Sequence, residues 1–313
     1  NKIQQKSSKR GKKINMKIFD CFMYFDEEVI LDLRLNILNP YIDYFIIVES
    51  SYTHKGDKRN LKFDIKEFDK FKEKIIYLTF DEIPSGIEEV FEDDSEDEKS
   101  RKLILNAAHR ENGQRNYISK GLGNAQDDDL ILISDVDEIP NLENLRIKDI
   151  KNKLVFFNQH MMYYKFNLKL RNINWYGSKA CKFKYLESPQ WIRNIKVRNF
   201  PWWRFDTLFS KKKYKDIRFI KNGGWHFSYL KKPKDIELKL KSYLHHIEYD
   251  ENPLGIEKIK KIIDEKKPIY DLKVDQRRDK FSSKNQLIKV DNNQLPSYII
   301  NNLEKFKEWI DND

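Results

Sequence analysis

Two aspartates separated by one residue, Asp135 and Asp137, lie in the run SDVDEIP at residues 134–140. Alternate positions of an extended chain point to the same side, so the two carboxylates are expected to face one point. Converging carboxylates repel unless a cation lies between them, and hard divalent ions such as Mn²⁺ or Mg²⁺ prefer oxygen ligands. Such an ion also binds phosphate oxygens and neutralises a leaving diphosphate. The motif therefore predicts a site for Mn²⁺ or Mg²⁺ as cofactor.

The residues around the two aspartates matter, because the same spacing occurs in surface loops where aspartates cap a turn. Residues 130–133 form a short, fully apolar run, which is typical of a buried strand, and Pro140 ends the segment. A motif at the carboxyl end of a buried strand lies where α/β sheets bind their ligands. We interpret the motif as a ligand site, with the turn cap as the alternative.

Apolar, β-branched runs predict three further strands, at residues 17–24, 44–48 and 75–78. The helical patterns between the strands cover residues 26–38, 65–74 and 101–122. Strands that alternate with helices indicate an α/β fold with a single Rossmann-like, mostly parallel central sheet and flanking helices. Glu49 and Ser50 follow the second strand, so we expect them to share a crevice with Asp135.

The pattern changes after residue 140, where strand-like segments follow one another without long helices, at 153–166, 175–185 and 218–229. Helical patterns return at 256–266 and 296–310. We expect one domain over residues 16–255, with halves 16–140 and 141–255, and a C-terminal helical extension, 256–313, packed on it. Residues 1–15 are expected to be a disordered basic tail or a linker.

The net charge of +10 suggests a nucleic-acid partner, but the excess charge is unevenly spread. Residues 1–15 contain six Lys and Arg residues and no acid, so this tail supplies over half of the excess. The rest of the chain is expected to bind no nucleic acid stably. The apolar content of 39% and the aromatic content of 13% favour a folded core over disorder.

Cys21 and Cys181 are the only cysteines, which excludes a disulfide framework and a cysteine metal site and favours a reducing compartment. No apolar run approaches the roughly 20 residues that a membrane-spanning helix needs. We therefore expect a cytoplasmic protein, or the soluble catalytic domain of a longer one, with an oligomeric state that the sequence leaves open.

Several stretches, in order along residues 17–250, make the sequence similar to glycosyltransferase family 17, the family of the enzyme that adds bisecting N-acetylglucosamine to N-glycans through a β-1,4 bond. They are FDCF at 19–22, RL at 34–35, DYFIIVES at 43–50, QRN at 114–116, residues 128–140 and GGWHFSY at 223–229. The resemblance implies a GT-A fold, inverting transfer and a nucleotide-sugar donor, with UDP as the expected nucleotide. Residues 16–140 would then bind the nucleotide sugar, and residues 141–255 the acceptor.

The resemblance also implies roles for particular residues. In GT-A enzymes the position of Glu49 meets the nucleoside, and a late histidine, here His226, is a further metal ligand. Alternative interpretations are a cap or turn role for Glu49 and a core position for His226 between Trp225 and Phe227. His245, with its neighbour His246, lies where a loop closes on the diphosphate, or else on the surface.

Arg115 stands out on physical grounds, because the expected helix at 101–122 has one face formed by Ile104, Ala108, Glu111, Arg115, Ile118 and Leu122. A guanidinium on an otherwise apolar stripe needs a partner. That partner is either an acid, Glu111 or one in the crevice, or the donor diphosphate. The expected donor-binding set is Glu49, Ser50, Arg115, Asn116, Asp135, Val136, Asp137 and His245, and the expected metal ligands are Asp135, Asp137 and His226.

Inverting transfer needs a base that deprotonates the acceptor hydroxyl as it attacks the sugar. Asp206, Glu187 and Glu138 are the candidates, the first two because they lie between the metal motif and His226 in the sequence. Sugar rings are expected to stack on aromatic side chains, which are Trp175, Tyr176, Trp191, Trp202 and Trp203.

The predicted function is inverting, metal-dependent transfer of a sugar, N-acetylglucosamine or another hexose, from a UDP-sugar to a glycan or other hydroxyl acceptor. A nucleotidyltransferase is one alternative, but it usually has a glycine-rich phosphate loop after its first strand, and residues 22–28 contain no glycine. A non-catalytic carbohydrate-binding protein on the same fold is another.

Overall fold

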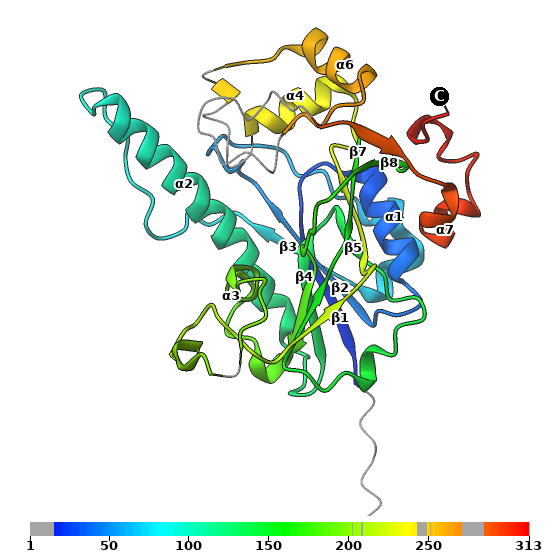
Figure 1. Ribbon diagram of the computed structural model, residues 1–313. Helices are drawn as coiled ribbons and strands as arrows, with labels where there is room; N and C mark the ends of the chain where they lie inside the picture. Colours follow the sequence, from blue (N-terminus) through cyan, green and yellow to red (C-terminus); the bar gives the residue numbers. More distant parts are fainter. Residues whose placement is uncertain are drawn as a thin grey trace, which may run out of the picture.

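A seven-stranded sheet forms the centre of the computed structural model, which describes residues 16–201, 203–207, 209–242, 249–250, 252–270 and 285–312 (Figure 1). The strand order is β10-β6-β9-β4-β1-β2-β3. All neighbours pair in parallel except β9, which runs antiparallel to β4 and β6. The strands are β1 (Ile18–Tyr24), β2 (Tyr44–Ser50), β3 (Ile75–Phe80), β4 (Leu130–Asp135), β6 (Leu154–Phe157), β9 (Lys179–Lys182) and β10 (Ile217–Ile220). The predicted α/β fold with a mostly parallel sheet is confirmed.

A second sheet of five strands, in the order β12-β8-β7-β11-β5, accompanies the first and was not predicted. Its strands are β5 (Glu138–Pro140), β7 (His160–Tyr163), β8 (Leu168–Leu170), β11 (Gly224–Ser228) and β12 (Leu287–Lys289). None is longer than five residues, so none shows a clear period of two. Pairing between distant segments, such as β5 with β11, defines this sheet instead.

The α-helices are α1 (Glu28–Leu38), α2 (Glu96–Tyr117), α3 (Pro189–Asn194), α4 (Pro233–Ser242), α6 (Ile256–Asp264) and α7 (Ser297–Ile300). The short 3₁₀ segments are η1 (Ile65–Lys74), η2 (Ile118–Leu122), η3 (Ile147–Asp149), η4 (Phe183–Tyr185), η5 (Phe205–Thr207), η6 (Asn292–Gln294) and η7 (Lys307–Trp309). Across the described ranges, no helix has the length and apolar character needed to cross a bilayer.

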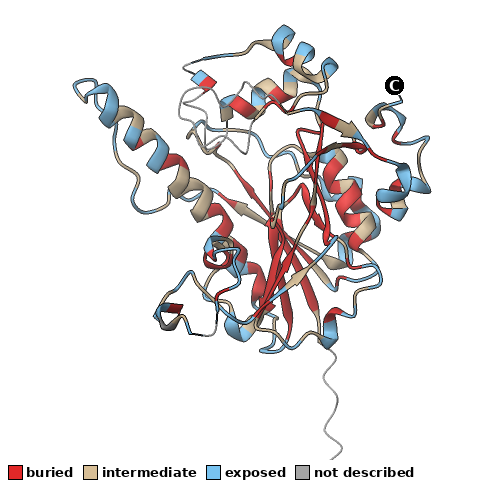
Figure 2. Ribbon diagram, viewed as in Figure 1, coloured by how far each residue is buried: buried red, intermediate tan, exposed pale blue. Residues whose placement is uncertain are grey.

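Both faces of the central sheet are covered, because alternate side chains of its strands enter different apolar clusters. On β1, Phe22 packs in a cluster with α1 and α7, whereas Phe19 packs in another with η2 and α3. Figure 2 shows the buried strands between these helices. A third cluster lies where α4 and α6 pack against the second sheet.

Helix α2 begins at Glu96, where the Ser95 hydroxyl caps the Glu98 N–H, rather than at Arg101. Its N-terminal half projects beyond the sheet (Figure 1), and Ile104 is 46% exposed. The apolar face expected along residues 104–122 is therefore wrong in its first turns. From Arg115 onward it is correct, because only that part of the helix lies over the sheet.

The C-terminal segment contributes a strand as well as helices. Strand β12 pairs with β8, α6 packs on α4, and α7 packs on α1. The helix expected over residues 296–310 is divided into α7 and η7. Residues 1–15 lie outside the described part of the chain.

Candidate active site

The aspartate motif lies where the chain leaves one sheet and enters the other. Asp135 is the last residue of β4 in the central sheet, and Glu138 is the first residue of β5 in the second sheet. Val136 and Asp137 form the turn between them. The extended geometry expected across the two aspartates is therefore absent, and their carboxylates contact different partners.

Pairing of β5 with β11 brings a distant segment onto the motif. The register sets His226 opposite Glu138, and the Phe227 N–H donates to the Asp137 carbonyl at 2.9 Å. Gly224 makes this approach possible: it has a φ of +131°, and a Cβ there would lie 2.1 Å from the Ile139 carbonyl oxygen. The strand pairing therefore fixes His226 beside Asp137.

The buried side chain of Arg34 binds the backbone of the motif. Its guanidinium is fully buried, pairs with Asp20 (Nη2 to Oδ1, 2.6 Å) and donates to the Ser134 hydroxyl at 2.6 Å. It also donates to three motif carbonyls, those of Asp135 (3.0 Å), Val136 (3.1 Å) and Glu138 (2.9 Å). One side chain from α1 thus donates to every backbone carbonyl of residues 135–138 except that of Asp137, which accepts from the Phe227 N–H.

Asp135 is bound by two arginines from different helices. Arg115 of α2 donates to its Oδ1 and Arg193 of α3 to its Oδ2, both at 3.0 Å. Arg115 also donates to Glu111 at 2.7 Å, so it makes both of the ion pairs that the sequence suggested, one with Glu111 and one with an acid of the crevice. Burial alone would raise the pKa of Asp135, but the two guanidinium groups outweigh it and lower that pKa.

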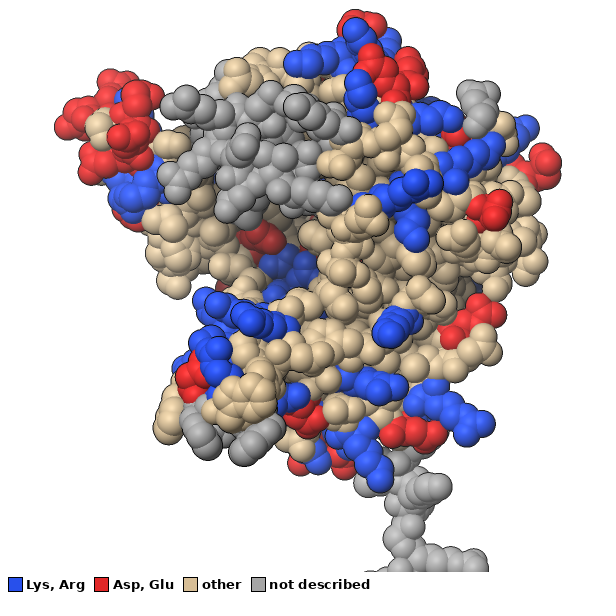
Figure 3. All heavy atoms as spheres, viewed as in Figure 1, with Lys and Arg blue, Asp and Glu red and all other residues tan. Residues whose placement is uncertain are grey.

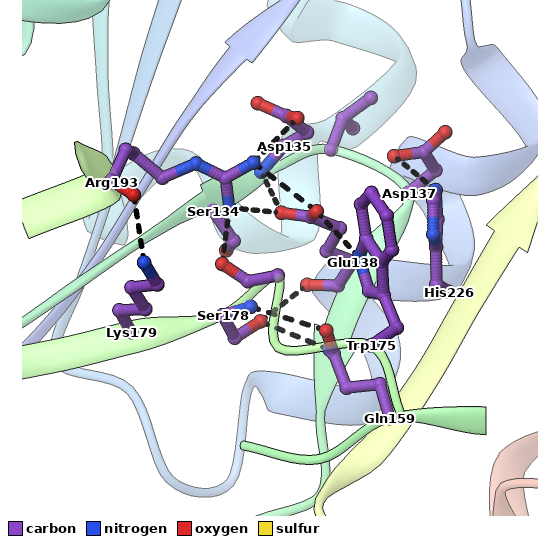
Figure 4. A network of polar contacts seen from close by, with 12 residues as sticks. Ser134, Asp135, Asp137, Glu138, Gln159, Trp175, Ser178, Lys179, Arg193 and His226 are labelled. Carbon is purple, nitrogen blue, oxygen red and sulfur yellow. Dashed lines mark hydrogen bonds and ion pairs between the residues drawn. The ribbon is translucent and has the colours of Figure 1, made fainter. Parts of the chain in front are cut away.

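Glu138 is also bound by Arg193, as Figure 4 shows. Its fully buried carboxylate accepts from Arg193 Nη1 (2.6 Å), the Trp175 indole N–H (2.9 Å) and the Asp135 N–H (2.7 Å). Gly177 packs directly against it, since a Cβ there would lie 2.1 Å from the carboxyl carbon. Glu138 therefore organises the site and has no access to an acceptor hydroxyl, which argues against it as the base.

Asp137 has a histidine and a lysine as its partners. Its Oδ1 lies 3.5 Å from His226 Nε2, and its Oδ2 lies 3.6 Å from the Lys239 ammonium of α4. Burial would raise the pKa of Asp137, but His226 and Lys239 outweigh it and hold that pKa well below its usual range. Burial likewise opposes the charge of Lys239, yet Asp137 and Glu27 raise its pKa.

These groups surround a cavity of about 440 Å³, here called the motif pocket. Figure 3 shows a hollow with acidic and basic atoms deep inside it. The lining residues are Met23, Tyr24, Phe25, Glu27, Ser50, Tyr52, His54, Glu111, Gln114, Arg115, Asp135, Val136, Asp137, Met161, Tyr163, Trp175, Arg193, His226, Ser228, Tyr229, Lys239, Ser242 and Tyr270. Within the described part of the chain, two buried polar atoms of this lining have no partner, Arg115 Nε and His226 Nδ1. Unsatisfied buried polar atoms are costly, so they favour a place where a polar ligand binds.

The residues present fit a divalent cation only if a substrate completes its coordination. Among the described residues, no group of three or more His, Cys, Asp or Glu side chains is arranged to hold a metal ion. Asp137 and His226 lie 3.5 Å apart, whereas Asp135 is bound by its two arginines. Mg²⁺ and similar ions commonly use one or two protein ligands together with phosphate oxygens and water.

Glu49 does not share this pocket, contrary to expectation. It is fully buried and accepts four hydrogen bonds, from Arg59 (2.9 Å), the Lys62 N–H (2.7 Å), the Phe63 N–H (3.0 Å) and the Tyr77 hydroxyl (2.9 Å). A carboxylate has about four acceptor sites, so none is left for a nucleoside. Ser50, the next residue along β2, lines the pocket instead.

The other two base candidates lie outside the motif pocket. Asp206 is exposed and paired with Arg204 (2.7 Å) and Lys213 (2.7 Å), and Glu187 is exposed with the Tyr214 hydroxyl 3.4 Å away. Neither contributes to the lining of the pocket. Their position between the motif and His226 in the sequence does not bring them to the motif in space.

Of the remaining predicted site residues, some line the motif pocket and others do not. Val136 lines the pocket, whereas Asn116 is exposed and accepts from the Gln190 N–H at 2.9 Å, which ties α2 to the start of α3. Of the aromatic residues, Trp175 stacks on the His226 ring with centroids 4.9 Å apart. His245, His246 and Trp202 lie outside the described residues.

Sequence reasoning missed Arg193 and Glu27. Arg193 lies on a six-residue helix with no strong periodic pattern, 55 residues from its partner Glu138. Only the capping signal of Ser188 before Pro189 marks that helix in the sequence. Nothing local indicates that its arginine turns toward the motif.

A comparison with protein-family models gives a match over most of the sequence. The model described as glycosyltransferase family 17 matches residues 4–310, nearly the whole chain. A search of curated proteins found no match.

Proposed function

The chain belongs to glycosyltransferase family 17 and is thus a sugar transferase, and we propose that it transfers a hexose, such as N-acetylglucosamine, from a UDP-sugar with inversion. The convergence of Asp137, His226, Lys239 and Arg115 on one pocket carries the proposal. Opposite charges gathered at the carboxyl ends of parallel strands suit a ligand that joins a diphosphate to a metal ion.

Asp137 and His226 are the residues proposed to hold the cation. A divalent ion bound there would neutralise the diphosphate as it leaves. Arg115 and Lys239 add fixed positive charge on either side, and both are already oriented by carboxylates. Asp135 acts through the arginines it binds, since it orients Arg115 and Arg193 toward the pocket.

The nucleoside is proposed to lie at the end of the pocket formed by Ser50, Tyr52, His54 and Gln114. The Gln114 amide donates to the Val48 carbonyl at 3.0 Å and its oxygen lies 3.1 Å from His54 Nε2. These contacts fix the side chains before a ligand arrives, which reduces the entropy lost on binding.

The base is proposed to be one of the carboxylates that line the pocket. Among the described residues these are Glu27, Glu111, Asp135 and Asp137. Since Asp137 is proposed to hold the cation and Asp135 to orient two arginines, Glu27 and Glu111 are the candidates for the base. Glu27 is oriented by the N–H groups of Phe25 (3.2 Å) and Asp26 (3.1 Å). Burial would raise the pKa of Glu27, but Lys231 and Lys239 outweigh it and lower that pKa, so Glu27 remains ionised.

The test is a thermal-shift panel of nucleotide sugars with Mn²⁺ or with EDTA. A UDP-sugar should raise the melting temperature in the presence of Mn²⁺, and the same sugar should be hydrolysed or transferred. A panel in which no nucleotide sugar binds under either condition would refute the proposal. A matched series with ADP-, GDP- and UDP-linked glucose identifies the nucleotide.

Transfer without a metal ion is a second candidate, and the position of Lys239 favours it. Its ammonium lies 3.6 Å from Asp137 and already provides positive charge at the place proposed for the ion. Full activity in EDTA, lost in Lys239→Met, would support this candidate over the metal-dependent one. Activity that requires Mn²⁺ in the wild type would exclude it.

A further inference from the structure

A second cavity of about 980 Å³, here called the side pocket, lies next to the motif pocket and shares Trp175 and Arg193 with it. Its lining residues are Asn158, Asn174, Trp175, Tyr176, Gly177, Lys179, Arg193, Val197, Arg198, Asn199, Phe219, Lys221 and Asn222. A molecule bound in it would face the motif pocket across Trp175 and Arg193. This is the position that a second substrate needs.

The charged residues of the side pocket are all basic, in contrast to the mixed charges of the motif pocket. Four cationic side chains line it, and no Asp or Glu is among its described lining residues. Four asparagines supply amide donors and acceptors, and Trp175, Tyr176 and Phe219 supply aromatic surface. Amides with aromatic rings suit the hydroxyls and apolar faces of a sugar.

Two of the four cations are already committed within the protein. Lys179 is buried and donates to the carbonyls of Arg193 (2.7 Å) and Ile195 (2.8 Å), and Arg193 binds Asp135 and Glu138. Burial and the nearby Arg193 guanidinium lower the pKa of Lys179 to about 7, so a large fraction of this side chain is uncharged at neutral pH. These two side chains shape the pocket.

The other two cations, Arg198 and Lys221, face solvent at the pocket. Neither makes an ion pair with any residue that the structure describes; the recorded side-chain contact of Arg198 is with the Phe200 ring, 5.8 Å away. Figure 3 shows Lys and Arg atoms gathered on the rim of the hollow. Unpaired cations beside aromatic and amide groups suit an anionic ligand that carries a sugar.

We propose that the side pocket binds the acceptor and that this acceptor is an anionic saccharide, whose carboxylate or phosphate group is held by Arg198 and Lys221. The inference rests on the proposed sugar transfer and names the class of acceptor. The sugar ring packs on Trp175 and Tyr176, and the reacting hydroxyl points past Trp175 toward the motif pocket. Arg198 and Lys221 select an acceptor by its negative charge and take no part in the chemical step.

The test measures binding of two matched pairs of saccharides to the intact protein by titration calorimetry. One pair is a hyaluronan tetrasaccharide and the uncharged tetramer of N-acetylglucosamine, and the other is mannose 6-phosphate and mannose. The charged member of at least one pair should bind roughly tenfold more tightly, as expected for two charge-assisted contacts. The pair that shows the preference identifies carboxylate or phosphate as the anion.

The double variant Arg198→Ala/Lys221→Ala should lose that preference and bind charged and neutral saccharides alike. The control, Lys66→Ala/Lys307→Ala, removes the same charge at exposed positions outside both pockets and should behave as the wild type. Arg198→Lys should retain most of the affinity, which separates charge recognition from a folding defect. Equal binding of charged and neutral saccharides by the wild type, or no binding of either, would overturn the inference.

Binding of the UDP-sugar, measured in parallel by thermal shift, separates this inference from the proposed function. Donor binding with no preference for anionic saccharides refutes the inference alone. A preference for anionic saccharides that depends on Arg198 and Lys221, without any nucleotide-sugar binding, refutes the proposed function and leaves an anionic-saccharide site.

Discussion

The motif pocket and the side pocket share Trp175 and Arg193 but differ in how their charges are balanced. In the motif pocket each aspartate has two partners within 3.6 Å, two arginines for Asp135 and a histidine and a lysine for Asp137, and no partner is fully exposed. In the side pocket Arg198 and Lys221 are exposed to solvent. In the proposals above, the motif pocket is therefore a preorganised centre for a highly charged ligand, and the side pocket is an adaptable surface that selects its ligand by charge.

The two pockets also differ in how much the loss of one charged side chain destabilises the protein. Removing one member of a buried charge network leaves its partners unpaired in a low dielectric, where the cost is several kcal/mol. Removing an exposed cation costs the protein itself little. The following predictions use that contrast, beginning with the largest expected effect.

Arg34→Met should cause the largest loss of stability. The substitution leaves the fully buried Asp20 carboxylate without its partner and removes one hydrogen bond from each of three motif carbonyls. The free energy of unfolding should fall by about 3–5 kcal/mol, measured by chemical denaturation. Arg101→Met is the control: it breaks an exposed pair with Glu88 and should cost no more than about 1 kcal/mol. Similar losses in the two variants would contradict the proposed importance of the buried network.

Asp137→Asn should cause the largest loss of activity in a folded protein. The amide keeps the shape of the side chain but loses the charge that pairs with His226 and Lys239. Transfer should fall by at least about a hundredfold, measured as release of UDP from the donor that the thermal-shift panel identifies. Asp128→Asn, at an exposed position paired with Lys182 and Lys184, should leave the rate unchanged.

Arg193→Lys tests the residue shared by the two pockets. A lysine keeps the charge but lacks the two guanidinium nitrogens with which Arg193 donates to Asp135 and to Glu138 at the same time. The rate should fall by roughly tenfold, and Glu138→Gln should add little to that loss because the two residues act as one unit. Fully additive effects in this double-mutant cycle would show that the two side chains act independently. Arg204→Lys, in an exposed pair with Asp206, is the control.

Salt should weaken anion binding in the side pocket more than UDP binding in the motif pocket. Exposed charges are screened over about 10 Å at 0.1 M salt, whereas buried pairs are screened less. Raising NaCl from about 50 to about 500 mM should weaken binding of the preferred anionic saccharide roughly fivefold. The neutral tetramer of N-acetylglucosamine should be unaffected. A neutral saccharide that responds equally would contradict the assignment of Arg198 and Lys221.

The smallest effect is expected for Asp206→Asn and Glu187→Gln. Both carboxylates are exposed and outside both pockets. Each variant should retain the wild-type rate to within about twofold, because changes at exposed positions away from a site usually have little effect. A loss of more than a hundredfold in either would restore that residue as the base, and would require the segment that carries it to close over the motif pocket.

The sequence alone was sufficient for the central sheet and for the motif at the end of β4. Strands β1 to β4 are fully or largely apolar runs, and apolar composition is a local property, so their positions could be predicted to within about two residues. The ion pairs of Arg115 were also predictable, since Glu111 lies one helical turn away and the helix faces the crevice.

Tertiary structure decided which polar residues face the site. Glu49 and Ser50 are adjacent on β2, yet the side chain of Glu49 is saturated by four donors from other segments while Ser50 lines the pocket. Arg193, Lys239 and His226 reach the motif through pairing and packing between segments 55 to 102 residues apart. A sequence records local periodicity and composition, whereas these contacts depend on strand register and helix placement, which are set by the whole fold.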